Sequence, residues 1–175
     1  LIGAIIMSHG DDDGLKVPPK LAPVHAVVVP ILHERDVAED QQVIDYGQRI
    51  AQRISKGVFA DKIPIAAKVD TRSMKAVEKR WNWIKRGVPV QIEIGPRDIL
   101  EEKAMIRLRS EDAFVKHEMS LTELEEKLPH LLEQIQKTYF EEAQNRLTNS
   151  MVSVKSYSEF HDFFTSKDEK GFVKA

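Results

Sequence analysis

The chain has 175 residues, of which 42% are hydrophobic and 31% are charged, enough to bury a core as one domain with a small appendage. Its net charge of −2 gives no overall reason to expect nucleic acid, and the absence of cysteine excludes disulfides and thiolate metal sites. The apolar runs have the length of strands and no targeting leader precedes them, so we expect a soluble, cytosolic protein without a membrane span.

The first segment, "LIGAIIM", is an apolar run of strand length that opens at Leu1 without a preceding turn. A strand needs neighbouring strands to pair its backbone groups. We therefore expect this run to be a strand from a longer protein, of which this chain is a piece.

The next stretch, "HGDDDGLKVPPKLAP", runs from His9 to Pro23 and is either a turn with a stiff hinge or a metal site. Asp11, Asp12 and Asp13 are consecutive, whereas a calcium loop needs oxygen ligands at alternate positions and a closing glutamate. Aspartates with Gly14 are typical of turns. The histidines form no pair at metal-ligand spacing, so no metal is predicted.

Strands and helices then alternate along the chain, which predicts an α/β fold with a mixed, mostly five-stranded sheet flanked by helices. The apolar and alternating runs predict strands, and the helical spacing predicts helices. The expected strands are Val24–Ile31, Ile63–Val69, the run from Val90 to Ile94, the run from Ala104 to Leu108, and Ala113–Met119. The expected helices are Asp36–Lys56 with Val43, Gly47, Ile50, Ala51 and Ile54 inward, and a helix capped by Ser73 with Val77, Trp81 and Ile84 inward.

A long helix follows with Leu124, Leu128, Leu131, Ile135, Tyr139 and Ala143 on one face, and Pro129 is expected to divide it. From Ser156 onward a helix and the beginning of a strand predict a partial α+β C-terminal appendage. The predicted domains are 1–22, 23–120 and 121–175.

Charge is distributed unevenly. Between Lys68 and Arg109 there are eleven basic and six acidic residues, whereas from Glu111 onward there are eight basic and thirteen acidic ones. A basic middle region suits a phosphate backbone, although solvated surface charges need no partner.

The segment from Arg80 to Asp98, "RWNWIKRGVPVQIEIGPRD", carries the candidate site. In its strand Gln91 and Glu93 alternate with apolar residues, and Gly95–Pro96 then presents Arg97 and Asp98. A structural interpretation makes Asp98 and Glu101 the capping box of a short helix. A functional interpretation makes the polar side chains one patch that reads unpaired bases, because arginine donates to guanine and a carboxylate accepts from it.

Two motifs together, "IGAIIMSHGDDDGLKVPPKLAPVHAVVVPI" and "GVPVQIEIGPRD", resemble the prolyl-tRNA synthetases where the catalytic domain leads into the anticodon-binding domain. The resemblance covers most of the chain. It implies that the first run is the remnant of a catalytic strand and that the catalytic residues lie outside this chain. It also implies a class II anticodon-binding domain and the start of a zinc-binding-like domain, for which we predict no zinc here.

The whole enzyme that the resemblance implies is cytoplasmic and dimeric, and joins L-proline to tRNA(Pro) through prolyl-adenylate, using ATP and Mg. This chain would recognise the anticodon and bind no cofactor. The implied anticodon-reading residues are Arg97, Asp98, Glu93, Gln91 and Arg86, and the implied backbone contacts are Arg72, Lys75 and Lys79. The family pattern has a carboxylate where this chain has Ile84 and an arginine where it has Gln91.

Two alternatives remain. The chain is also compatible with a free-standing anticodon-binding-like module that serves as an accessory or protein-interaction subunit without ligase activity. A soluble α/β domain without any role in RNA binding is the other.

Overall fold

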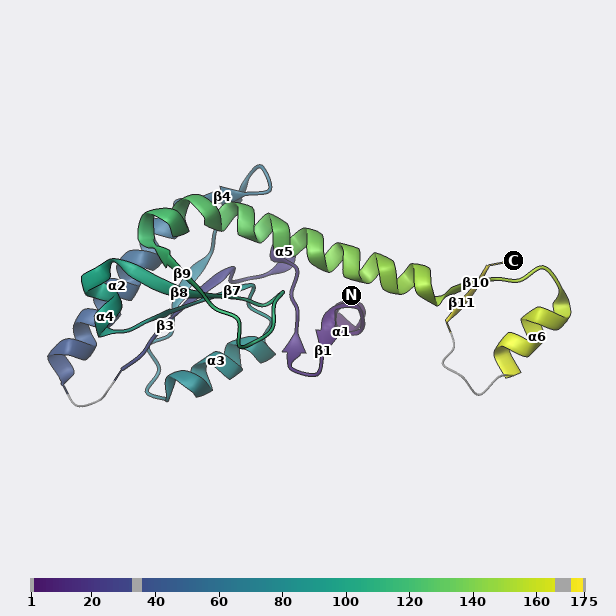
Figure 1. Cartoon of the computed structure of the whole chain (residues 1–175), viewed down its shortest axis with the longest axis horizontal. Helices are drawn as coiled ribbons and strands as arrows, with labels where there is room; N and C mark the ends of the chain where they lie inside the picture. The colour runs from purple at the N-terminus through teal and green to yellow at the C-terminus, as the bar shows by residue number, and fades with distance from the viewer. Residues whose placement is uncertain (1, 33–35, 166–170, 175) are drawn as a thin grey trace. The chain divides into compact units, whose positions relative to one another are not determined.

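A five-stranded mixed sheet is the centre of the first of two units, which ends at Tyr139 (Figure 1). The structure is a computed structural model and describes residues 2–32, 36–165 and 171–174. β3 lies parallel to both β6 and β7, and β8 and β9 continue the sheet in antiparallel pairing. In spatial order the strands are β6 (Ala67–Val69), β3 (Ala26–Pro30), β7 (Val90–Ile94), β8 (Lys103–Leu108) and β9 (His117–Ser120). The predicted mixed α/β sheet is confirmed.

Helices cover the two faces of this sheet unequally. α2 (Val37–Ile54) and α5 (Leu121–Ser150) pack on one face, where they bury the larger apolar cluster. α3 (Ala76–Lys85) lies on the opposite face, where Trp83 packs against Val27 and Val29 (Figure 1). We call this second side the α3 face. The short α4 (Pro96–Glu101) joins β7 to β8.

The predicted inward positions of α2 and of the central strands are confirmed. Val43, Gly47, Ile50, Ala51 and Ile54 of α2 are all buried. All five residues of β3 are buried, so this strand is covered on both faces as its continuous apolar run predicts. Asp36 caps α2 by accepting hydrogen bonds from two backbone N–H groups.

The first segment folds differently from the prediction. Residues Ile2–His9 form a helix, α1, in which no residue is buried. None of the described strands pairs with this segment, and a helix satisfies its backbone hydrogen bonds internally. The expected strand is therefore wrong for this structure.

The loop that follows is a turn, as predicted. β1 (Gly10–Asp11) and β2 (Gly14–Leu15) form a small hairpin. The Asp11 carboxylate accepts hydrogen bonds from the backbone N–H groups of Asp13 and Gly14, at 3.1 and 3.0 Å, in an Asx turn. The chain then passes through a 3-10 turn, η1 (Pro19–Leu21), into the sheet.

The predicted strand Ile63–Val69 is divided. Its first part, β5 (Ile63–Pro64), forms a separate hairpin with β4 (Val58–Phe59), and only Ala67–Val69 joins the main sheet. The predicted fifth strand, Ala113–Met119, is confirmed only in its last three residues, because the observed strand is His117–Ser120.

α3 begins later than predicted, and the residues that it buries are not all the predicted ones. Its N-cap is Lys75 rather than Ser73, and its buried residues are Lys79, Trp83 and Ile84. Val77 is 55% exposed, so the expected inward face is wrong at that position. The tryptophan that packs inward is Trp83, whose ring nitrogen donates a hydrogen bond to the buried carboxylate of Asp70.

The Pro129 division is also wrong, because α5 is one continuous helix through that residue. Proline in a helix interior costs about 3 kcal/mol. Leu124 and Leu128 before it and Leu132 and Ile135 after it are at most 1% exposed. Each buried side chain of this size stabilises by roughly 1.5–3 kcal/mol, so packing on both sides of the proline outweighs the defect.

The second unit begins at Phe140 and contains a small parallel pair of strands with one helix. These elements are β10 (Met151–Ser153), α6 (Tyr157–Thr165) and β11 (Phe172–Lys174). A helix followed by a strand agrees with the predicted appendage.

A buried carboxylate joins the sheet to α3. Asp70, directly after β6, is 2% exposed and accepts hydrogen bonds from Arg72 Nη2 at 2.6 Å and Trp83 Nε1 at 2.8 Å. Burial alone would raise the pKa of this carboxyl, but the Arg72 and Trp83 hydrogen bonds outweigh burial and lower it to about 2. The Lys79 ammonium donates to the Asp70 carbonyl oxygen at 3.1 Å, so two side chains of α3, Trp83 and Lys79, hydrogen-bond to this residue.

Replacing Asp70 with asparagine should lower the free energy of unfolding at neutral pH by about 3 kcal/mol, because the buried Lys79 ammonium and the partly exposed Arg72 guanidinium lose their counter-ion. Since the folded-state pKa lies below the ordinary value of 3.8, the ionised carboxylate stabilises the fold above about pH 4, and this contribution disappears as the pH falls toward 2. Urea denaturation at pH 7 and at pH 3 measures both effects. Asp12→Asn, an exposed position in the hairpin turn, is the control; equal stabilities of the two variants would contradict the assigned role.

Gly87→Ala should destabilise the contact between the hairpin and α3. Gly87 has φ +74°, and an added Cβ would lie 2.7 Å from the Leu15 carbonyl oxygen. The backbone conformation alone costs roughly 1–2 kcal/mol for a residue with a side chain. Thermal unfolding should register this loss, whereas Gly3→Ala, which places its Cβ in open space on α1, should leave stability unchanged or raise it slightly.

Candidate functional site

The polar residues of β7 point to the α3 face. Val90, Ile92 and Ile94 are fully buried in the larger apolar cluster, so the alternation of the strand turns Gln91 and Glu93 the other way. Pairing with β8 places Arg107 directly opposite Gln91. Two residues of the predicted patch therefore share one face of the sheet.

Glu93 is the centre of an ionic cluster on this face. Its carboxylate lies 3.2 Å from Arg107 Nε and 3.8 Å from Arg80 Nη1. Neither Nε atom of the two arginines has a hydrogen-bond partner in the described structure, so the interaction is ionic rather than directional. Glu93 consequently neutralises the cations beside it and is not an isolated acceptor.

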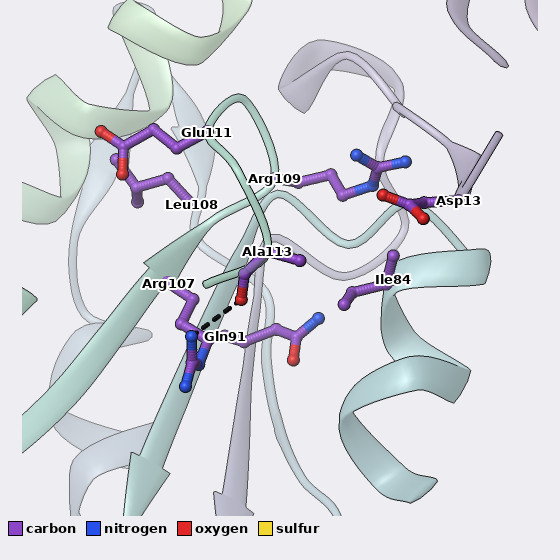
Figure 2. A pocket seen from close by; sticks show the side chains of 8 residues that line it. All are labelled: Asp13, Ile84, Gln91, Arg107, Leu108, Arg109, Glu111 and Ala113. Carbon is purple, nitrogen blue, oxygen red and sulfur yellow. Dashed lines mark hydrogen bonds between the residues drawn. The ribbon is translucent and has the colours of Figure 1, made fainter. Parts of the chain in front are cut away.

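Arg107 also fixes the loop that follows β8. Its Nη1 donates to the carbonyl oxygen of Ala113 at 2.8 Å, the dashed line in Figure 2, and to that of Val115 at 3.4 Å. His117 Nε2 lies 2.7 Å from the Glu111 carboxylate at the other side of this loop. The loop is therefore held in place over the sheet.

A small hollow lies between this loop, the end of α3 and the hairpin turn (Figure 2). Its enclosed part measures about 20 Å³, enough for one water molecule. We call it the sheet hollow, and its lining includes Asp13, Ile84, Gln91, Arg107, Arg109 and Ala113.

Gln91 is the buried polar group of the sheet hollow. It is 3% exposed, and its Nε2 makes a long hydrogen bond of 3.4 Å to the Arg80 carbonyl oxygen. Its Oε1 is buried without a hydrogen-bond partner among the described residues. An unpaired buried acceptor is costly, so this atom is placed for a ligand or water that donates a hydrogen bond.

Asp98 and Arg97 lie beyond the carboxyl end of β7 and do not line the sheet hollow. The Asp98 carboxylate accepts a hydrogen bond of 2.6 Å from the Gly95 N–H and so caps α4. Asp98 is therefore the third residue of α4 with Gly95 as N-cap, whereas the predicted capping box made Asp98 itself the N-cap. Arg97 is exposed, and the described residues offer it no ion pair.

The predicted phosphate-binding cations, and Arg86 of the predicted anticodon-reading set, have different environments. Lys75 and Arg86 are exposed, and the Arg86 guanidinium lies 5.2 Å from the centre of the Trp83 ring. Arg72 is paired with Asp70 but 42% exposed in its side chain. Lys79 is 1% exposed, and burial lowers the pKa of its ammonium, so the structure does not favour the phosphate contact predicted for Lys79.

A second, wider groove adjoins these cations at the other side of α3. It measures about 340 Å³, and Lys68, Trp83 and Arg86 are part of its lining. A groove lined by two exposed cations, Lys68 and Arg86, suits an anionic ligand such as a phosphate backbone.

Sequence reasoning missed three residues of the site. Arg107 and Arg109 alternate with Ile106 and Leu108, a pattern that places their side chains on the same face as Gln91. Arg109 is 8% exposed and donates from Nη2 to Asp11 and from Nε to the Leu15 carbonyl oxygen. Asp13 comes from a distant part of the sequence, and no local pattern identifies it.

Two further features of the described residues bear on function. No group of three or more His, Asp or Glu side chains in the described ranges is arranged to hold a metal ion. Among the described helices, none combines the length and apolar character that crossing a membrane requires.

A family model, curated proteins and solved structures all relate this chain to the anticodon-binding part of proline–tRNA ligases. The family model described as "Anticodon binding domain" matches residues 25–131. The chain is 35% identical over 182 residues to a proline–tRNA ligase of Protochlamydia amoebophila, covering all of this chain and 35% of that protein. A proline–tRNA ligase of Clostridium novyi is 37% identical over 175 residues, covering all of this chain and 33% of that protein.

The fold is also that of a solved synthetase. The crystal structure of prolyl-tRNA synthetase from Cryptosporidium parvum in complex with L-proline and AMP superimposes with a TM-score of 0.75 at 32% identity, covering 92% of this chain and 32% of that one. This chain spans about a third of the length of the curated relatives it matches. It belongs to the anticodon binding domain family, in agreement with the predicted resemblance to prolyl-tRNA synthetases.

Proposed function

We propose that this chain is the anticodon-recognising part of a proline–tRNA ligase and binds the anticodon stem-loop of tRNA(Pro). The observation that carries the proposal is the match of the whole chain, including the hinge before residue 25, to proline–tRNA ligases. A free-standing anticodon-binding module would have no need of that hinge, so the match favours the ligase.

In this proposal the complete cytoplasmic, dimeric enzyme joins L-proline to tRNA(Pro) with ATP and Mg, and aminoacylation needs parts of the protein outside these 175 residues. Residues 1–22 then belong to the end of the catalytic domain, 23–120 to the anticodon-binding domain and 121–175 to the long helix and the appendage. The AMP and L-proline named in the Cryptosporidium complex support ATP and proline as substrates of the whole enzyme.

The anticodon would lie on the α3 face and across the carboxyl end of β7. Proline anticodons share two guanines, and an exposed arginine recognises guanine through its O6 and N7 acceptors. Arg97 is exposed and unpaired within the described residues, so its guanidinium is accessible to a base. Asp98 positions Arg97 by capping α4, and Gln91 lines the sheet hollow on the α3 face.

Arg97→Ala should weaken binding to tRNA(Pro) about tenfold or more, and it should weaken binding to a tRNA without the two guanines much less. Filter binding or fluorescence anisotropy at one fixed salt concentration measures both affinities. Lys56→Ala, an exposed cation beyond the end of α2, is the matched control. Equal losses on both RNAs would leave Arg97 with a phosphate contact only.

Lys75→Ala and Arg86→Ala should instead weaken all RNAs alike. Each contact of a cation with a phosphate releases a counter-ion, so each substitution should reduce the slope of log affinity against log salt by about 1. Titrations between low and moderate salt measure this slope. An unchanged slope in either variant would remove that residue from the RNA interface.

A further inference from the structure

The hairpin turn between β1 and β2 is fixed against the end of α3. An added Cβ at Gly14 would lie 2.5 Å from the Lys85 Cα, so the two backbones are in close contact. The Val17 N–H donates to the Gly87 carbonyl oxygen at 3.3 Å. These contacts bring Asp13 to the sheet hollow, where it lies near Ile84 (Figure 2). The side chain of Ile84 has no polar atom.

Asp13 differs from the other carboxylates near this hollow because its charge is not used by the fold. Asp11 is paired with Arg109, Glu111 with His117, and Asp112 accepts from the Phe114 N–H at 2.8 Å. The Asp13 carboxylate makes no hydrogen bond or ion pair with the described residues, and the residue is exposed. It is therefore available as an acceptor.

Gln91 supplies a second acceptor in the same hollow. Gln91 is only 3% exposed, and its Oε1 has no hydrogen-bond partner among the described residues. Two available acceptors in one hollow favour a ligand with two donors. Among the bases, guanine has two adjacent N–H donor groups, N1 and N2, on its Watson–Crick edge, whereas that edge of adenine, cytosine and uracil has only one donor group.

Space for a base lies next to the sheet hollow. An outer hollow of about 390 Å³ shares Asp13, Arg109, Glu111 and Ala113 with it. Trp81 and Phe114 are part of its lining, and Phe114 is 80% exposed. Aromatic side chains of this kind are stacking surfaces for unpaired bases.

We propose that Asp13 is a specificity-determining residue that accepts hydrogen bonds from the Watson–Crick edge of an unpaired guanine, which lies in the outer hollow with this edge toward the sheet hollow. The guanine N2 amino group donates to the Asp13 carboxylate, and the base stacks on Trp81 or Phe114. The inference rests on the proposed function, because the anticodon of tRNA(Pro) supplies the guanine.

The test uses hairpin RNAs with the anticodon loop of tRNA(Pro) and two protein variants, Asp13→Asn and Asp12→Asn. Asp12 is the matched control, because it is exposed in the same turn but lines neither hollow. Asp13→Asn should bind the hairpin about tenfold more weakly than wild type, and Asp12→Asn should bind within twofold of it. Asp13→Glu, which keeps a carboxylate, should recover part of the affinity.

A second pair of measurements identifies the atoms. Inosine lacks the N2 amino group of guanosine. Replacing each of the two guanosines by inosine in turn should weaken wild-type binding at one of the two positions. On that hairpin Asp13→Asn should cause no further loss. Wild-type affinity in Asp13→Asn, or an equal loss on the guanine and inosine hairpins, would overturn the inference while leaving the proposed function intact. Failure of the wild-type chain to prefer the tRNA(Pro) loop would overturn both.

Discussion

The placement of α3 by the buried Asp70 carboxylate is the interaction on which the α3 face depends. α3 is the helix that packs on that face of the sheet, and its side chains border both the sheet hollow and the groove. Asp70 contacts it through Trp83 and Lys79 and orders the preceding loop through Arg72. A salt-bridged carboxylate in a buried site is costly to leave unpaired, so this arrangement specifies one position of the helix rather than merely adding attraction.

Local sequence patterns predicted the sheet, whereas two wrong predictions, at Ile2–His9 and at Pro129, concern segments whose structure depends on the elements packed against them. Alternation in β7 and β8 and the helical spacing of α2 report directly which side chains are buried. Ile2–His9 has the composition of a strand but finds no partner strand among the described residues, and Pro129 stays within a helix because leucines on both sides are buried. In both cases the outcome depends on which other elements pack or pair with the segment, and the local sequence does not show this.

The strand residues of the candidate site could be predicted from the sequence, whereas the roles of Asp98 and Asp13 could not. Alternation placed Gln91 and Glu93 together, and the same rule applied to β8 would have added Arg107 and Arg109. Sequence alone did not separate Asp98, which caps α4, from a side chain that is available to a ligand, because both uses need a carboxylate after a turn. Asp13 reaches the sheet hollow through a backbone contact between residues about seventy positions apart, Gly14 and Lys85, which only the folded chain reveals.

The basic middle region illustrates why a charge count overstates a nucleic-acid surface. Of its eleven cations, six form ion pairs or hydrogen bonds with other residues of the chain: Arg72, Lys79, Arg80, Lys103, Arg107 and Arg109. The exposed remainder is Lys68, Lys75, Lys85, Arg86 and Arg97, distributed from the edge strand β6 along α3 to α4. Such a sparse set supplies a modest, salt-sensitive attraction for a phosphate backbone. Discrimination among RNAs must then come from the few polar groups that the fold leaves unpaired, because a phosphate contact reads no sequence.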